Sequence, residues 1–207
     1  MKLHAINTGT FKLDGGAMFG VVPKPLWQRT NPADTKNRID MAMRCLLIED
    51  ENRLILVDNG LGQKYNDKFA SIYGVDHETH TLDRSLEALG FHRSDITDVI
   101  LTHLHFDHCG GSTEWNSGKE RYVVVYENAQ FWVQSSHLDW ALNPNPREKA
   151  SFYDENIRPL VDSGQLSLLD GESELFPNIF LKVVNGHTEA QQLPLIHYKG
   201  KKILFAA

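Results

Sequence analysis

The chain has 207 residues, of which 41% are hydrophobic and 23% charged, and its formal net charge is −6 at pH 7. A chain of this length can bury a sizeable core, so we expect one domain spanning residues 1–207. The acidic balance argues against a nucleic-acid-binding protein, which needs a basic face. No stretch reaches the roughly 18 apolar residues of a membrane span, and no signal peptide is evident, so we expect a cytoplasmic protein with no membrane partner.

The N-terminal quarter is predicted to contain strands around one apolar loop. Residues 3–13 favour an opening strand, and residues 14–16 (Asp-Gly-Gly) favour a turn. Residues 41–48 and 53–57 predict a hairpin. Between the turn and this hairpin, residues 17–27 are apolar, but their glycines and prolines break both helix and strand. An apolar loop must either pack against the core or bind something.

Two helices and a buried strand are predicted next. Residues 63–73 favour a helix that ends at Gly74, and residues 81–89 favour another that ends at Gly90. The short run of β-branched and apolar residues at 96–101 is typical of a buried strand.

Directly after this strand, three histidines and an aspartate lie within six residues. In an extended chain, side chains two apart point the same way, so His103 and His105 share a face and Asp107 follows on it. His108 points away unless the backbone bends, and the glycines at 110–111 permit a bend or a close backbone approach. Imidazole and carboxylate suit zinc, and also iron, manganese or cobalt. The spacing therefore predicts two adjacent metal sites, one at each end of the run.

The second half of the chain is predicted to mix helices with strands. We expect the following segments: a strand at 121–126, a helix at 129–135, a loop at 138–146, a partly helical segment at 148–162 interrupted at Pro159, and strands at 166–169, 179–184, 193–198 and 201–205. Alternating strand and helix blocks imply a layered α/β architecture.

The two cysteines, Cys45 and Cys109, are too few for a disulfide framework. Cys109 follows the histidine run, so it is either a reactive thiol or a small buried residue. The buried residue is the favoured interpretation.

Three motifs, taken in their order along the chain, resemble the metallo-β-lactamase-fold hydrolases. The first is His-x-His-x-Asp-His at 103–108, after a strand and before two glycines. The second is Val-Asp-Asn-Gly at 57–60, and the third is Gly-His-Thr at 186–188, each after a strand. Within the family, the chain is most similar to N-acyl homoserine lactonase-like members. The resemblance implies an αββα sandwich with its metals at one edge of the paired sheets.

The resemblance also implies a ligand set for two zinc ions in the complete protein. The first ion takes His187 together with the first two histidines of the run, His103 and His105. The second ion takes Asp107 and His108, and Asp107 also orients the nucleophile.

Outside the metal ligands, the resemblance assigns two further roles. Asp58 holds the ligand loop by hydrogen bonds, although a turn-forming aspartate fits the same position. In lactonase-like members, the apolar segment that here carries Met18, Phe19 and Trp27 lines the substrate pocket. A plug at the edge of the core is the alternative.

The function implied by the resemblance is metal-dependent hydrolysis of a small-molecule ester or lactone by activated water. Within the same fold, the alternatives are a glyoxalase II-like thioesterase and a phosphotriesterase. Outside enzymes, the alternative is a metal-binding module without turnover.

The chain departs from the family pattern in two places. Family members continue after such a last strand with an aspartate that bridges both metals, then a further histidine, strands and a helix, whereas this sequence ends at Ala207. We therefore expect a fold truncated at its C-terminus, a weak second metal site and an exposed sheet edge that favours association, including a homodimer. In addition, residues 189–191 are Glu-Ala-Gln where many relatives have Pro-Gly-His.

Overall fold

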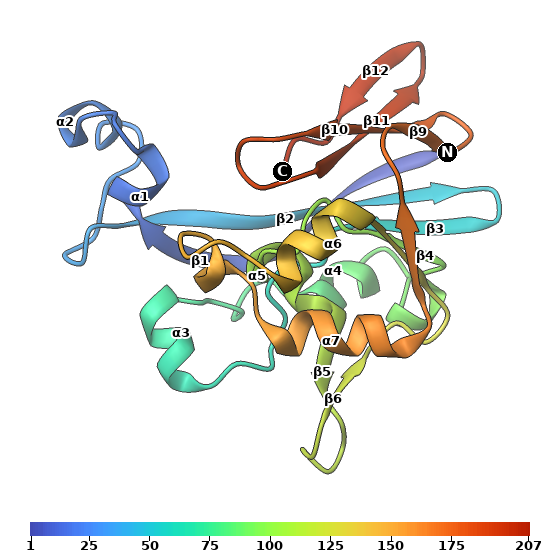
Figure 1. Ribbon diagram of the computed structural model, residues 1–207, viewed down its shortest axis with the longest axis horizontal. Coiled ribbons are helices and arrows are strands. Elements are labelled where there is room, and N and C mark those ends of the chain that lie inside the picture. The colour runs from blue at the N-terminus through green and yellow to red at the C-terminus, as the bar shows by residue number, and fades with distance from the viewer.

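Two β-sheets pack face to face in the computed structural model, which describes all residues 1–207 (Figure 1). The six-stranded sheet has the order β1-β2-β3-β4-β7-β8, and the four-stranded sheet has the order β12-β11-β10-β9. The strands of the larger sheet are β1 (Lys2–Asp14), β2 (Arg38–Asp50), β3 (Arg53–Val57), β4 (Asp98–Ile100), β7 (Gln130–Gln134) and β8 (Leu166–Leu169). Those of the smaller sheet are β9 (Ser173–Phe176), β10 (Ile179–Val184), β11 (Gln191–Tyr198) and β12 (Lys201–Leu204).

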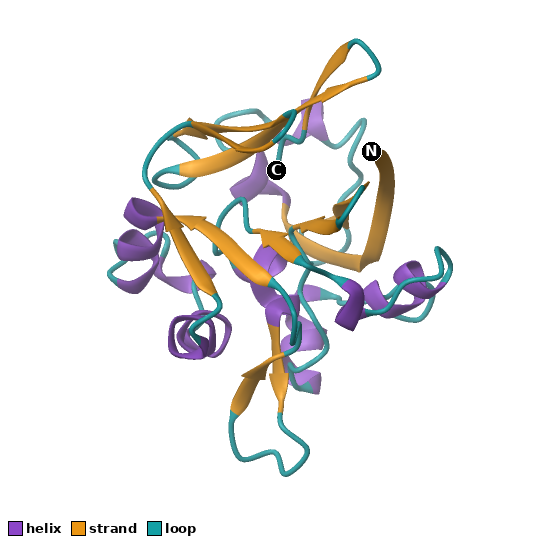
Figure 2. Cartoon of the chain, turned by 90° about the vertical axis from the view of Figure 1, so that its right-hand side faces the viewer, coloured by secondary structure: helices purple, strands orange, loops and turns teal.

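Helices cover the face of the larger sheet that is turned away from the smaller one (Figure 1). The α-helices are α1 (Gly15–Phe19), α2 (Lys24–Trp27), α3 (Asp67–Tyr73), α4 (Leu82–Glu87), α5 (Phe106–Cys109), α6 (Ser135–Leu142) and α7 (Asp154–Ser163). Three 3-10 turns are Arg93–Asp95, Gly110–Ser112 and Lys149–Ser151. A separate hairpin of β5 (Thr113–Trp115) and β6 (Tyr122–Val124) projects from the end opposite the smaller sheet (Figure 2).

Successive side chains of β3 are apolar on both faces of the larger sheet, as expected for a strand that is covered on both sides. Leu54 and Leu56 pack into the core under the helices, which includes residues of α4, α6 and α7. Ile55 and Val57 pack into the core between the sheets, which includes residues of β9, β10 and β11. Because successive side chains of a strand point to opposite faces, this single strand contributes to both cores. The layered α/β architecture predicted from the sequence is confirmed.

Several predicted elements are confirmed because their signals are local. The β2–β3 hairpin forms as expected, and Gly74 ends α3 in the left-handed conformation with φ 52°. The last hairpin turns at Lys199 and Gly200, whose φ angles of 50° and 74° are those of a two-residue turn with both central residues at positive φ.

The predicted helix at 129–135 is wrong, and the predicted loop at 138–146 is confirmed only at residues 143–146. Residues 130–134 form β7, which pairs in parallel with β4 and β8 and buries Phe131 and Val133. The following residues form α6. Strand pairing with distant partners overrides the weak local preference of this segment.

The predicted interruption at Pro159 is wrong, because α7 continues through it from Asp154 to Ser163. A proline lacks the N–H that would bond to the carbonyl four residues earlier, here that of Glu155. That carbonyl instead accepts a hydrogen bond of 2.8 Å from the hydroxyl of Thr113. A tertiary contact therefore satisfies the group that the proline leaves free.

The apolar segment at 17–27 is not a plain loop, because it forms the one-turn helices α1 and α2. The Asp14 side chain accepts a hydrogen bond of 2.8 Å from the N–H of Ala17, and a proline occupies the first turn of α2. Both features are helix start signals that outweigh the breakers in so short a segment.

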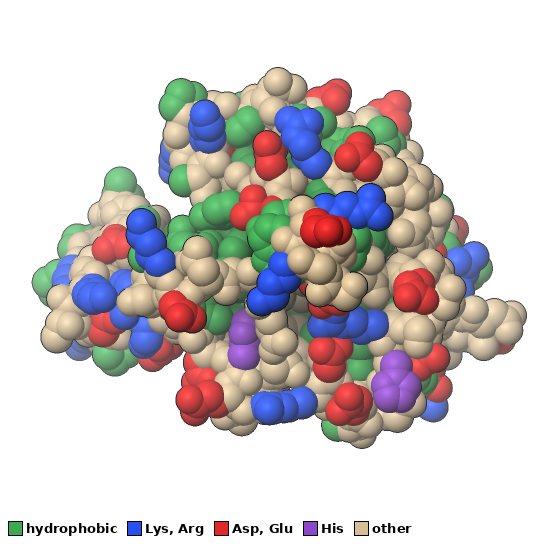
Figure 3. All heavy atoms as spheres, turned by 90° about the horizontal axis from the view of Figure 1, so that it is seen from below, with side chains coloured by type: hydrophobic (Ala, Val, Ile, Leu, Met, Phe, Trp, Pro, Cys, Tyr) green, Lys and Arg blue, Asp and Glu red, His purple; other side chains and the backbone are tan.

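The visible surface carries charged side chains of both signs. Seen from below, basic and acidic side chains are interspersed over the molecule (Figure 3). None of the helices has both the length and the apolar character that crossing a bilayer requires.

Candidate metal centre

The ligand run lies where β4 leaves the larger sheet. The strand ends at Ile100, the chain bends at Thr102, His105 has an extended backbone, and α5 begins at Phe106. Extension to Asp107 was therefore a wrong expectation, because Asp107 and His108 already lie on a helical turn. The carbonyls of Leu101 and Thr102, just before the run, accept hydrogen bonds from Gln192 of β11, which joins this edge of the larger sheet to the smaller one.

Three histidines from two distant segments converge at this edge. His103, His105 and His187 each offer one ring nitrogen, and the three nitrogens lie within 4.8 Å of one another. The Nδ1 of His105 faces the Nε2 of His187 at 3.1 Å. The Nδ1 of His103 contacts the hydroxyl of Thr102 at 3.0 Å, so its Nε2 is the nitrogen left for a ligand.

The chemistry of these nitrogens fits a metal ion. The Nε2 of His103, the nitrogen left for a ligand, is buried and has no hydrogen-bond partner, which is costly for a polar group. Burial, reinforced by the neighbouring imidazoles, lowers the pKa of His105 to about 3 and that of His103 well below its usual range. Burial also lowers the pKa of His187. Neutral imidazoles with free lone pairs are what a metal such as zinc requires.

Asp58 lies beneath the ligand run in the left-handed conformation, with φ 56°. One carboxylate oxygen accepts a hydrogen bond of 2.8 Å from the N–H of Thr102. The other lies 2.8 Å from both the hydroxyl of Thr102 and the Nδ1 of His108. This buried carboxylate therefore joins the start of the ligand run to its end.

Asp107 and His108 lie beside the three-histidine cluster. The His108 ring centroid is 4.0 Å from that of His103, and its Nε2 is 3.5 Å from the Asp107 carboxylate. Burial opposes a charge on His108, but the carboxylates of Asp107 and Asp58 outweigh it and raise its pKa to about 9. At neutral pH this imidazole is a cation between two carboxylates.

The two glycines after the run allow the close backbone approach that the sequence predicted. A Cβ on Gly110 would lie 2.3 Å from the carbonyl oxygen of Leu61, and one on Gly111 would lie 2.2 Å from that of Asn59. The N–H of Gly111 donates to the carbonyl of Gly60 at 2.9 Å. Only glycine lets the loop after β3 lie directly against the segment after α5.

One buried histidine of this site has no signal in the sequence. His137 of α6 is fully buried. Its Nε2 accepts a hydrogen bond of 2.8 Å from the N–H of Leu104, and its Nδ1 lies 2.6 Å from the carbonyl oxygen of Glu189. Burial lowers its pKa to about 4, so the ring is neutral and bridges the two backbone segments that carry the metal ligands. Residue 137 lies between the predicted helix at 129–135 and the predicted loop at 138–146, so no element was expected there and its inward orientation was not foreseen.

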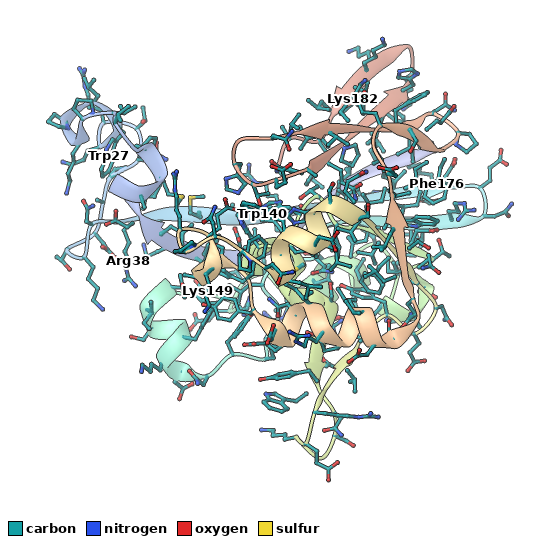
Figure 4. All side chains as sticks on the ribbon, in the orientation of Figure 1. Trp27, Arg38, Trp140, Lys149, Phe176 and Lys182 are labelled. Atoms are coloured by element: carbon teal, nitrogen blue, oxygen red, sulfur yellow. The ribbon has the colours of Figure 1, made fainter.

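The three apolar residues proposed for the substrate pocket lie on the N-terminal helices. Trp27 is 4% exposed, stacks on Phe19 at a centroid distance of 5.1 Å and packs against Gly15. Met18 is 45% exposed. Figure 4 shows Trp27 at one end of the molecule, whereas Trp140 lies on α6 near the centre. None of the three residues lines the 420 Å³ pocket that Asp58, Asp107 and His108 border.

Both cysteines are free and buried. Burial raises the pKa of Cys109 to about 12 and that of Cys45 well above its usual value. The Cys109 thiol contacts the carbonyl of Leu104 at 3.3 Å. Cys109 is therefore the small buried residue that the sequence favoured, because a reactive thiol needs a lowered pKa.

Comparison with known proteins agrees with this geometry. A curated N-acyl homoserine lactonase from Bacillus thuringiensis is 24% identical over 201 residues, which cover 92% of this chain and 68% of that protein. A second lactonase, from Bacillus sp., is 25% identical over 167 residues, which cover 76% of this chain and 59% of that protein. The chain thus spans 59–68% of the length of these two relatives.

Solved structures show the same fold. A probable metal-dependent hydrolase from Staphylococcus aureus superposes with a TM-score of 0.88 at 33% identity, over 98% of this chain and 71% of that one. AidC, a dizinc quorum-quenching lactonase in complex with its product, superposes with a TM-score of 0.74 at 22% identity, over 98% and 69% of the two chains. The model of the metallo-beta-lactamase superfamily matches residues 44–207. With most of its length matched and its three histidines converging at one sheet edge, the chain belongs to the metallo-β-lactamase superfamily.

Proposed function

We propose that the protein is a metal-dependent hydrolase that cleaves the ester bond of a lactone. The observation that carries this proposal is the cluster of three neutral histidines, His103, His105 and His187, whose ligand atoms lie within 4.8 Å of one another. One solved relative is named a probable metal-dependent hydrolase, and the two curated relatives are named N-acyl homoserine lactonases.

In this proposal the three histidines hold one ion, for which zinc is the first candidate and iron, manganese or cobalt the others. Three protein ligands leave a position for water, as in catalytic zinc sites. When bound, such an ion supplies Lewis-acid activation of the water and of the substrate carbonyl. Asp107 orients the attacking water through its carboxylate. Asp107 and His108 are also the residues proposed to hold a second ion, which requires His108 to release its proton.

Around the reacting groups, Asp58 is proposed to keep the ligand run in place through its bonds to Thr102 and His108. The pocket beside Asp107 has a volume of 420 Å³, within the range of small-molecule sites, and Phe11 and Met43 contribute apolar lining. Met18 and Phe19 are proposed as an outer wall for larger substrates, with Trp27 supporting Phe19 by stacking. A cytoplasmic location and a homodimer stay predictions.

Metal analysis combined with a substrate panel tests the proposal. We expect the purified protein to contain zinc or a related metal and to hydrolyse an N-acyl homoserine lactone. A chelator should remove the activity and added metal should restore it. Preference for a thioester or a phosphotriester would instead support the thioesterase or phosphotriesterase alternative. Metal binding with no turnover on any panel member would support a non-enzymatic metal-binding module.

A further inference from the structure

One nitrogen of the histidine cluster is left without a partner even when a metal is bound as proposed. The Nδ1 of His105 points at the Nε2 of His187, so Nδ1 is the atom placed to bind the ion. The opposite ring nitrogen, Nε2, is buried and has no hydrogen-bond partner. A carboxylate oxygen of Glu148 lies 3.9 Å from this Nε2.

The Glu148 carboxylate is held in place by other residues. The same oxygen, Oε2, accepts hydrogen bonds of 2.8 Å from the hydroxyl of Thr188 and 3.0 Å from the indole N–H of Trp140. Its side chain is 19% exposed. Because Thr188 directly follows His187, this one carboxylate lies next to both segments that supply histidines to the cluster.

The turn that carries Glu148 is itself ordered. The side-chain oxygen of Asn145 accepts hydrogen bonds of 2.9 Å from the N–H groups of Arg147 and Glu148. A few residues later, the ring of Phe152 packs against that of His105 at a centroid distance of 4.8 Å. Figure 4 shows Trp140 on α6, before this turn, and Lys149 after it. The segment between α6 and α7 thus packs directly on a metal-ligand candidate.

We propose that Glu148 is the positioning residue for His105: its carboxylate accepts a hydrogen bond from Nε2–H and fixes the tautomer whose Nδ1 lone pair faces the metal. Histidines that bind metals commonly donate their second N–H to a carboxylate, which orients the ring and makes the ligand nitrogen more basic. The Nε2–oxygen distance must shorten from 3.9 Å to the hydrogen-bond range of about 2.7–2.9 Å, which a small rotation of either side chain provides. This inference rests on the metal site of the proposed function and adds a residue from the segment between the ligand motifs.

Glu148→Gln tests the inference most sharply, because the amide keeps the size of the side chain and one acceptor oxygen but loses the charge. We expect the zinc affinity, measured by competition with a chromogenic chelator, to fall by roughly 10–100-fold, as losses of such outer partners do. The zinc affinity of Glu148→Ala should fall by at least as much. The unfolding temperature of the metal-free Glu148→Gln protein should stay near that of the wild type. Glu127→Gln, which neutralises an exposed carboxylate elsewhere, is the matched control and should bind zinc as the wild type does.

A spectroscopic measurement separates positioning from general support of the fold. With cobalt in place of zinc, we expect the visible absorption bands of Glu148→Gln to shift relative to the wild type, since one ligand has changed its basicity and orientation. Zinc affinity and cobalt spectrum both equal to the wild type would overturn the inference, even if the variant unfolds at a lower temperature. A wild-type protein that binds no metal at all would overturn the proposed function, and this inference with it.

Discussion

His103 and His105 lie in the connection between β4 and α5, whereas Asp107 and His108 lie on the single turn of α5. In the first pair the Nε2 of each ring is buried without a partner, and both rings are neutral. In the second pair the imidazole is cationic and bonded to Asp58, with Asp107 also close. Neighbours in sequence therefore meet opposite electrostatic conditions.

This difference shows that ligand spacing alone does not prepare a site for a cation. In the three-histidine cluster, the buried Nε2 of His103 has no partner in the protein, and burial disfavours a proton on this ring. On α5, His108 is already bonded to Asp58, so a metal there must first displace a proton from His108. We therefore expect the first equivalent of zinc to bind at the histidine cluster.

Removing one histidine of the cluster should have the largest effect. His105→Ala leaves two of the three ligands, so zinc affinity should fall by more than the roughly 100-fold upper value for outer partners. Isothermal titration of the metal-free protein measures this loss. His80→Ala, which removes an exposed histidine outside the run, serves as the control. An unchanged affinity in His105→Ala would show that the metal does not use this nitrogen.

Asp58→Asn should have the next largest effect, because Asp58 contacts both the start and the end of the ligand run. The amide keeps the size of the side chain, and asparagine tolerates the left-handed backbone found here. Loss of the charge weakens the bonds to Thr102 and to cationic His108, so zinc affinity or turnover should fall by roughly 10–100-fold while the protein stays folded. Unchanged metal content and turnover, measured by elemental analysis and initial rates, would contradict the supporting role.

Acid should weaken the fold through the neutral histidines. His137 has its pKa lowered to about 4, against about 6.5 in an unfolded chain, so between these values the unfolded state binds a proton that the folded state does not. Stability is then fully present above pH 6.5 and decreases as the pH falls towards 4, by up to about 3 kcal/mol for this residue. Urea unfolding of the metal-free protein at several pH values measures the slope. His137→Gln should flatten it, and an equal slope in the variant would contradict the assignment.

Local signals explain which parts of the fold were predictable. Gly74 at a helix end and Lys199-Gly200 in a hairpin act within a few residues, so the sequence displays them directly. The strand at β7 exists because β4 and β8 flank it, and those partners are distant in sequence. Helix α6 was hidden by the same error.

The residues of the site likewise divide into those with a local sequence signal and those placed by distant contacts. His103 and His105 share a face because of strand parity, and His187 was placed by the family motif. His137 reaches Leu104 across 33 residues and Glu148 reaches Thr188 across 40, and no local pattern encodes contacts of that range. Ala190 adds a further case, since its φ of 49° is positive, a conformation that strains alanine and that the sequence alone does not reveal.

Met18→Ala should have the smallest effect and should show whether the N-terminal helices take part in catalysis. Because the Met18 side chain is 45% exposed, its loss should change the free energy of unfolding by less than about 0.5 kcal/mol. It should leave zinc affinity unchanged, since Met18 touches no ligand of the cluster. If Met18 borders the substrate, KM for lactones with long acyl chains should rise by about two- to tenfold at constant kcat, the pattern of lost uniform binding.

Acyl-chain length makes the Met18 experiment decisive. An outer wall contacts only long substrates, so KM for a short-chain lactone should stay at the wild-type value in Met18→Ala. Val21→Ala removes a side chain that is 99% exposed and was not assigned to the wall, so it should change neither KM value. Equal KM values for Met18→Ala and the wild type at every chain length would assign α1 to packing alone. The N-terminal region and the metal centre would then differ in kind, one supporting the fold and the other carrying the chemistry.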